Sequence, residues 1–148
     1  MNNPNPNPAF WSGKRVLLIG HTGFKGAWLA LWLSRLGARV TGLAQPPATD
    51  PNLFTLAGIG DLADSHLQDL RDPDAVAVIV RRADPEIVLH LAAQPLVRAS
   101  YRDPLGNFST NIQGTANLLD APRPSASGSM CSSPWPPISG SPSNSGTI

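Results

Sequence analysis

The apolar residues of this chain alternate between two patterns. Unbroken apolar runs are typical of parallel strands that are covered on both faces, and they predict strands at residues 14–20 and 86–91. Short strands are also predicted at residues 39–43 and 67–70. Apolar residues at helical spacing predict helices at residues 23–36, 72–82 and from Asn107 or Ser109 to about Ala121. Residues 53–67 give no clear pattern beyond a short helical turn.

The order of these elements predicts the fold. Strands and helices alternate, which is typical of α/β proteins built on a doubly wound parallel sheet of the Rossmann type. Right-handed crossovers then place the first strand near the middle of the sheet. We expect Trp28 and Trp32 to lie in the helix core, and His90 to be a core histidine rather than a catalyst.

The two ends of the chain differ in composition from the middle. Residues 1–9 are an Asn-Pro repeat that is expected to be disordered. Most of residues 122–148 are Ser, Pro or Gly, with Arg123 as the only charged residue, so this tail is also expected to be disordered. A partial Rossmann domain is therefore predicted at residues 10–121, truncated because no further strand is readable after its last helix.

The tail has two interpretations. One is that residues 122–148 are translated out of frame, because a consistent choice of GC-rich codons gives a valine-rich strand in another frame. The other is a natural disordered extension. The downstream DNA sequence distinguishes them, since an out-of-frame tail requires a longer reading frame to continue beyond it.

Charge and cysteine content exclude several classes of protein. The formal net charge is +1, with both signs interleaved, so neither nucleic acid nor a membrane surface is an expected partner. No apolar run is long enough to span a bilayer, and the N-terminus does not resemble a signal peptide, so a cytoplasmic location is expected. Cys131 is the only cysteine, which excludes an internal disulfide, and no metal site is predicted.

A glycine-rich turn is the strongest functional motif. Gly20-His-Thr-Gly23-Phe-Lys-Gly26 follows a predicted strand and begins a predicted helix. Such a turn lets the backbone approach a pyrophosphate, which binds the free N–H groups at the helix N-terminus. The alternative is a glycine-rich turn with no ligand. The candidate cofactor-binding residues here are Gly20, Thr22, Gly23, Phe24, Lys25 and Gly26.

The end of the second predicted strand leaves the choice of dinucleotide open. A carboxylate at this place often binds the adenosine ribose of NAD. Residues 41–45 contain none, and no arginine follows directly to bind the extra phosphate of NADP. Charge alone therefore does not separate the two cofactors, although the missing arginine favours NAD.

Three further segments, with the G-x-x-G-x-x-G spacing, resemble the extended short-chain dehydrogenase/reductase superfamily. Asp69-Leu70 resembles its adenine-contacting pair, Leu91-Ala92-Ala93-Gln94 its small-residue turn under the cofactor, and Asn111-Ile-Gln-Gly-Thr115 the helix whose Asn braces the active-site strand. The resemblance implies cofactor contacts for these residues. Taken singly, Asp69 also fits a solvated loop acid, and Asn111 a helix-surface amide.

The exact amino-acid sequences of two segments narrow the resemblance to one group of enzymes. Residues 21–26 together with 92–101 resemble the CDP-glucose 4,6-dehydratases, and the resemblance covers residues 11–121. It implies bound NAD, a substrate that is CDP-glucose or a related sugar nucleotide, and a homodimer, although the sequence itself shows no interface. It also places Arg98 near the substrate, and Ser100 and Tyr101 near the cofactor. The alternatives are a surface arginine and a packed aromatic residue.

The catalytic residues of that family are not found in this chain. The lyases of that family act in deoxysugar and lipopolysaccharide precursor synthesis. A Tyr-x-x-x-Lys pair starts their reaction. Tyr101 is the only tyrosine, and no lysine follows Lys25. We therefore predict no catalytic residue and an inactive chain. The alternatives are another sugar-nucleotide dehydratase or epimerase, or a non-catalytic nucleotide-binding remnant.

Overall fold

A four-stranded parallel sheet forms the centre of the protein. The computed structural model describes residues 7–121; the expected disorder of residues 1–6 and 122–148 lies outside the described residues. The strands are β1 (Arg15–Ile19), β2 (Arg39–Ala44), β3 (Asp64–Leu67) and β4 (Ile87–His90), in the order β3-β2-β1-β4. The Rossmann-type α/β fold and the inner position of β1 are thus confirmed.

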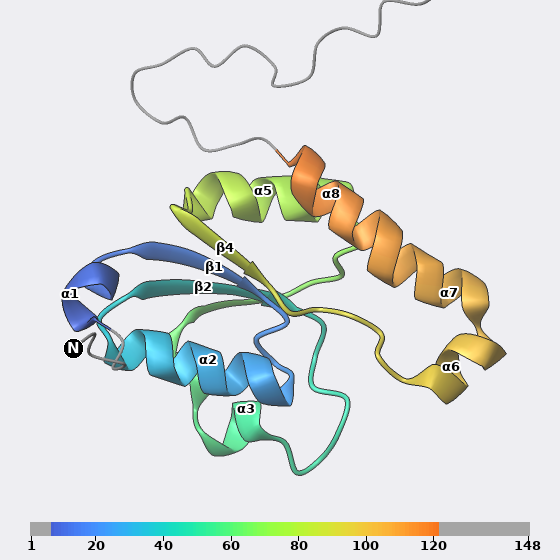
Figure 1. Cartoon of the computed structure of the whole chain (residues 1–148), viewed down its shortest axis with the longest axis horizontal. Helices are drawn as coiled ribbons and strands as arrows, with labels where there is room; N and C mark the ends of the chain where they lie inside the picture. Colours follow the sequence, from blue (N-terminus) through green and yellow to red (C-terminus); the bar gives the residue numbers. More distant parts are fainter. Residues whose placement is uncertain (1–6, 122–148) are drawn as a thin grey trace, which may run out of the picture.

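Helices cover both faces of this sheet (Figure 1). On one face, α2 (Phe24–Arg35) and the short helices α3 (Leu53–Leu56) and α4 (Ile59–Leu62) pack on β1 and β2. On the other, α5 (Pro73–Ala83) and α8 (Gly114–Asp120) lie side by side. Apolar side chains of β1 alternate between these two layers, so both faces of this strand are buried.

One long helical segment follows β4. It comprises α6 (Val97–Arg102), α7 (Pro104–Phe108), the π-helical turn η1 (Ser109–Gln113) and α8. Figure 1 shows that α6 and α7 extend beyond the ends of the strands. Asp103 caps α7 because its Oδ1 accepts a hydrogen bond from the amide of Gly106. None of the helices within residues 7–121 is long and apolar enough to cross a membrane.

The third strand lies earlier than the sequence predicts. The prediction at residues 67–70 was wrong, because β3 spans Asp64–Leu67. Its register with β2 pairs Thr41 with Asp64 and Ala44 with Leu67. Asp69 therefore lies in the loop after the strand. Pairing with β2 fixes this strand, whose own residues carry little apolar pattern.

The N-terminal leader contains a short helix. Residues 8 and 9 were predicted to be disordered, but α1 spans Pro8–Trp11. The side chain of Asn7 accepts a hydrogen bond from the amide of Ala9, and Pro8 occupies the first helical position. The Asn-Pro pair at residues 7–8 therefore begins a helix.

Three residues expected in the core are exposed. Trp28 and Trp32 are each 52% exposed, because Ala27, Ala30 and Leu33 form the side of α2 that faces the sheet. His90 is exposed at the end of β4, an edge strand of the described sheet, where its Nε2 lies 3.0 Å from Thr115 Oγ1. Partial burial of the ring also lowers the pKa of His90. Its position as a core histidine was a wrong prediction.

Candidate functional site

A cleft opens at the carboxyl ends of the strands. β2 and β4 flank β1 on opposite sides, and ligands of open parallel sheets bind where the strand order switches in this way. The cleft has a volume of about 240 Å³. The predicted cofactor residues that line it come from three separate segments: Gly20, Thr22, Gly23, Asp69, Leu70, Leu91, Ala92 and Ala93.

The turn after β1 requires glycine at two positions. Gly20 has a φ of +91°, and a Cβ there would lie 2.7 Å from the amide nitrogen of Ala92. A Cβ on Gly26 would overlap the carbonyl oxygen of Gly20. Strand β1, the loop after β4 and the first turn of α2 therefore approach one another closely only because both side chains are absent.

The N-terminus of α2 is open toward an anion. Gly23 is its N-cap, no side chain caps it, and its first turn contains no acidic residue. The first amides of a helix have no intrahelical partner and carry the positive end of the helix dipole. Because Gly23 also lines the cleft, this helix end can hold a pyrophosphate without displacing a side chain.

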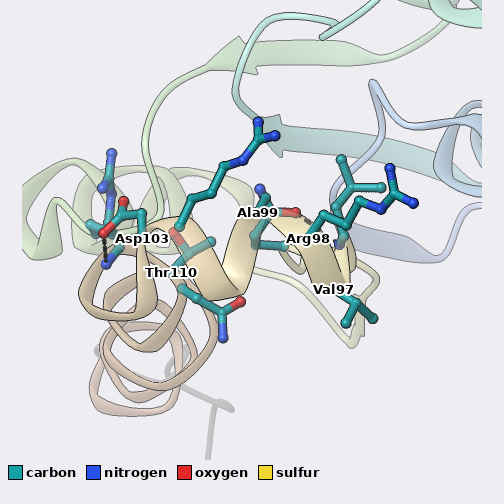
Figure 2. A pocket seen from close by; sticks show the side chains of 11 residues that line it. Val97, Arg98, Ala99, Asp103 and Thr110 are labelled. Atoms are coloured by element: carbon teal, nitrogen blue, oxygen red, sulfur yellow. Dashed lines mark hydrogen bonds between the residues drawn. The ribbon is translucent and has the colours of Figure 1, made fainter.

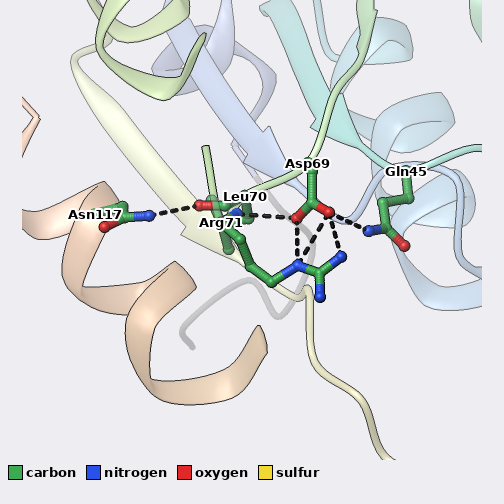
Figure 3. Close-up of polar contacts among 5 residues, drawn as sticks. All are labelled: Gln45, Asp69, Leu70, Arg71 and Asn117. Carbon is green, nitrogen blue, oxygen red and sulfur yellow. Dashed lines mark hydrogen bonds and ion pairs between the residues drawn. The ribbon is translucent and has the colours of Figure 1, made fainter. Parts of the chain in front are cut away.

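A network of charged and amide groups closes another part of the cleft (Figure 3). Gln45 Nε2 donates to Asp69 Oδ2 at 2.8 Å, and Arg71 Nε lies 3.0 Å from both carboxylate oxygens. The Arg71 guanidinium lowers the pKa of Asp69 to about 2, with help from Gln45 and against the effect of burial. Asp69 therefore stays ionised and fully engaged in this network.

The loop after β4 is held by the long helical segment. The side chain of Asn111, in η1, accepts a hydrogen bond from the amide of Gln94 at 2.7 Å and also donates to the carbonyl oxygen of Gln94. Nearby, Asn117 donates to the carbonyl oxygen of Leu70 at 3.1 Å. The side chains of Asn111 and Asn117 thus hold two segments of the cleft wall in place. Asn111 itself does not line the cleft.

Other predicted residues lie away from the cleft. The side chains of Phe24 and Lys25 face the outer surface of α2 beside Trp28, because Gly26 and Ala27 occupy the side toward the sheet. Only their backbone amides can face a ligand at the turn. Tyr101 is 84% exposed on α6 and does not line the cleft.

Arg98 lines a second, larger cavity of about 660 Å³ (Figure 2). Gln94, Arg71 and Arg102 line it as well, and Thr110 belongs to the walls of both hollows. The structure thus brings Arg98 and Gln94 together, next to the cleft but not in it.

Several lining residues were not candidates in the sequence. Gln45 ends its predicted segment without a carboxylate, which hid its role, although its position directly after β2 was a usable signal. Pro46, Ala48 and Gln68 lie in loops without a motif. Thr110 precedes Asn111 and reaches the cleft only because the helical segment folds back over it.

Comparisons with known proteins agree with this geometry. The sequence profile of the family described as GDP-mannose 4,6 dehydratase matches residues 17–132. The chain is 50% identical over 111 residues to the CDP-glucose 4,6-dehydratase of Salmonella typhimurium, covering 75% of this chain and 31% of that protein. It is 32% identical to the CDP-paratose 2-epimerase of Salmonella typhi, covering 74% of this chain and 32% of that protein.

Solved structures give the same result. The UDP-glucose 4-epimerase of Thermus thermophilus, in complex with NAD, superimposes with a TM-score of 0.64 at 32% identity, covering 72% of this chain and 33% of that chain. The chain thus spans about a third of the length of the relatives it matches. The profile match covers most of the sequence, and the chain therefore belongs to the GDP-mannose 4,6 dehydratase family of sugar-nucleotide dehydratases and epimerases.

Proposed function

We propose that residues 10–121 form the NAD-binding part of a sugar-nucleotide 4,6-dehydratase that acts on CDP-glucose. The observation that carries this proposal is the uncapped N-terminus of α2 above the Gly20–Gly23 turn, inside a cleft at the switch in strand order. A dinucleotide pyrophosphate fits this helix end, because the backbone is bare there and no acidic residue opposes the charge.

The remaining cleft residues would bind different parts of the cofactor. Asp69 and Leu70 would receive the adenine, with Gln45 beside the adenosine ribose. Leu91, Ala92 and Ala93 would support the nicotinamide half, where small side chains leave room. NAD is favoured over NADP because Arg71, which shares Asp69 with Gln45, is already paired with that carboxylate.

Bound NAD would supply reversible hydride transfer to and from the sugar. This chain's own residues would bind and orient the dinucleotide, and Arg98, in the adjoining cavity, would lie toward the sugar nucleotide. The 148 residues contain no Tyr-x-x-x-Lys pair, so the chain alone is expected to bind NAD without turning over substrate. CDP-glucose is the preferred substrate because of the 50% identity to an enzyme of that name.

Two related proposals complete this function. We expect the full-length enzyme to be a homodimer, because Leu105, Phe108, Ile112 and Leu119 expose a stripe of apolar side chains along α7, η1 and α8. We also expect it to work in the cytoplasm. The rival within the same family is another dehydratase or an epimerase, such as the UDP-glucose 4-epimerases that share the fold.

The test measures NAD binding to the 148-residue chain by calorimetry and thermal unfolding. Since a ligand that binds only the folded state stabilises it, NAD at roughly 100 times its Kd should add about 2.7 kcal/mol to the free energy of unfolding. In Gly26→Ala, the new methyl group would overlap the carbonyl of Gly20 and weaken binding at least about tenfold.

Gly60→Ala is the matched control. Gly60 is exposed in α4, and a Cβ there would come no closer than 3.5 Å to another side chain, that of Phe54. This variant should bind NAD as the wild type does. An unchanged unfolding temperature of the wild-type chain at saturating NAD would refute cofactor binding, and turnover of CDP-glucose by it would refute the predicted inactivity.

A further inference from the structure

The second residue of the glycine-rich turn, His21, is fully buried, although the turn itself faces the cleft. Its exposed fraction is 0%, whereas Thr22 is half-buried and Gly23 is exposed. The His21 Nε2 lies 2.6 Å from Ser65 Oγ on β3. The ring also meets Phe54 of α3 edge to face, with the ring centroids 5.4 Å apart. His21 therefore joins the turn to two elements that the glycines do not touch.

The space for this ring exists because residue 42 is glycine. A Cβ on Gly42 would lie 2.5 Å from His21 Cδ2 and Cγ, and the nearest atoms it would meet all belong to His21. Gly42 is in the middle of β2, paired with Leu18 of β1 and Ser65 of β3. The imidazole thus lies against Gly42 of β2 and reaches Ser65 of β3.

Among the described residues, two hydrogen bonds join the turn to β2 and to the residue that follows it. The amide of Gly20 donates to the carbonyl of Leu43 at 2.8 Å, and Thr22 Oγ1 donates to the carbonyl of Gln45 at 2.8 Å. His21 lies between these two points. Because its side chain reaches β3, His21 fixes the distance between the turn and the sheet.

We propose that His21 is the positioning residue of the phosphate-binding turn. Its buried ring packs on Gly42 and is hydrogen-bonded to Ser65. The ring thereby sets the position of the backbone amides at the N-terminus of α2, and with it the affinity for the dinucleotide. This inference rests on the proposed function. The ring does not touch the ligand, and it acts through the backbone of residues 20–23. Its Nδ1, buried without a hydrogen-bond partner of good geometry, matches a neutral ring that is held by shape and one hydrogen bond.

A double-mutant cycle in the 148-residue chain tests the role of the ring. The variants are His21→Ala, Gly42→Ala and the two together, each measured for NAD affinity by calorimetry and for amide hydrogen exchange of residues 20–23 without ligand. His21→Ala should weaken NAD binding about five- to tenfold, the equivalent of one buried hydrogen bond. Gly42→Ala should do the same because it displaces the ring.

The double variant separates this role from general destabilisation. With the ring removed, the methyl group at residue 42 has room, so the double variant should bind NAD no more weakly than His21→Ala. Val40→Ala, at the opposite end of β2 and in the core, should lower the unfolding temperature without changing the affinity or the exchange of the turn amides.

The outcomes distinguish the two proposals. If the wild type binds NAD and His21→Ala binds it equally well, or if Gly42→Ala and His21→Ala are simply additive, the positioning role is wrong. If the wild type does not bind NAD at all, the proposed function fails, and hydrogen exchange still decides the positioning role. Faster exchange of the turn amides in His21→Ala but not in Val40→Ala supports it, and equal exchange overturns it.

Discussion

At the scale of single residues, Gln45 is the side chain best placed to set cofactor choice. It follows β2 directly, where a carboxylate would accept a hydrogen bond from the adenosine ribose of NAD and repel the phosphate of NADP. Its amide instead donates to Asp69, whose carboxylate is also held by Arg71. The Gln45 side chain and the backbone amide and guanidinium of Arg71 together make five hydrogen bonds to Asp69. A carboxylate has about four acceptor sites, so an adenine amine can reach Asp69 only by replacing one of these donors.

Gln45→Asp should therefore shift selectivity toward NAD. The variant removes the donor from Asp69 and adds a carboxylate at the end of β2, so the ratio of the NADP and NAD dissociation constants should rise about tenfold or more. Calorimetric titration with each cofactor measures it. Gln45→Asn is the control, since it shortens the side chain without adding charge; an equal change in both variants would mean that charge at this position does not select the cofactor.

His21 should also make the stability of the fold depend on pH. Burial lowers the pKa of His21 from 6.5 to about 4, partly offset by the backbone of Leu43 and reinforced by His66. The unfolded chain therefore binds the proton first, and the free energy of unfolding should fall by about 3 kcal/mol as the pH drops from about 6.5 to 4. It should be highest above pH 6.5.

Urea denaturation at a series of pH values, comparing the wild type with His21→Gln, measures this effect. The other groups near the ring are His66 on β3, which contacts Asp64, and the neutral Phe54 on α3. Both groups are present in the wild type and in the variant, so the difference between the two curves isolates His21. Parallel curves between pH 6.5 and 4 would show that His21 does not supply this pH dependence.

At the scale of elements, local signals determined what the sequence could predict. Asp72 accepts hydrogen bonds from the amides of Asp74 and Ala75, so the predicted start of α5 is confirmed. The glycine-rich turn was equally readable from its glycine spacing, although the close approach of Gly20 to Ala92 is a tertiary contact. β3 was misplaced because its position depends on pairing with β2, and Trp28 was misplaced because helical spacing does not say which face of a helix meets the sheet.

The cleft was only partly readable for the same reason. Motifs marked the turn, the loop after β4 and Asp69, whereas Gln45 and Thr110 gain their places in the cleft from tertiary contacts. The π-helical turn η1 is one such contact. It places Asn111 so that one side chain both donates to and accepts from the backbone of Gln94. A π turn inside an α-helical segment frequently marks a functional site.

At the scale of the whole molecule, the distribution of exposed apolar residues predicts how copies associate. Leu105, Phe108, Ile112 and Leu119 are all exposed along the α7–η1–α8 segment. Phe108 is 58% exposed and Leu119 is 76% exposed. Soluble proteins rarely leave such a stripe in water unless another surface covers it.

A second copy is the expected cover, and a single charge should prevent it. In the full-length enzyme, Phe108→Asp places a carboxylate in the centre of the stripe, where pairing would bury it without a partner. The full-length variant should therefore be a monomer in light scattering after size-exclusion chromatography, while the full-length wild type elutes as a dimer. Leu56→Asp is the control, because Leu56 is 75% exposed on α3, away from the stripe. If both variants remain dimeric, this stripe is not the interface. If only Phe108→Asp dissociates and still binds NAD, association and cofactor binding use separate surfaces, as the positions of the stripe and the cleft require.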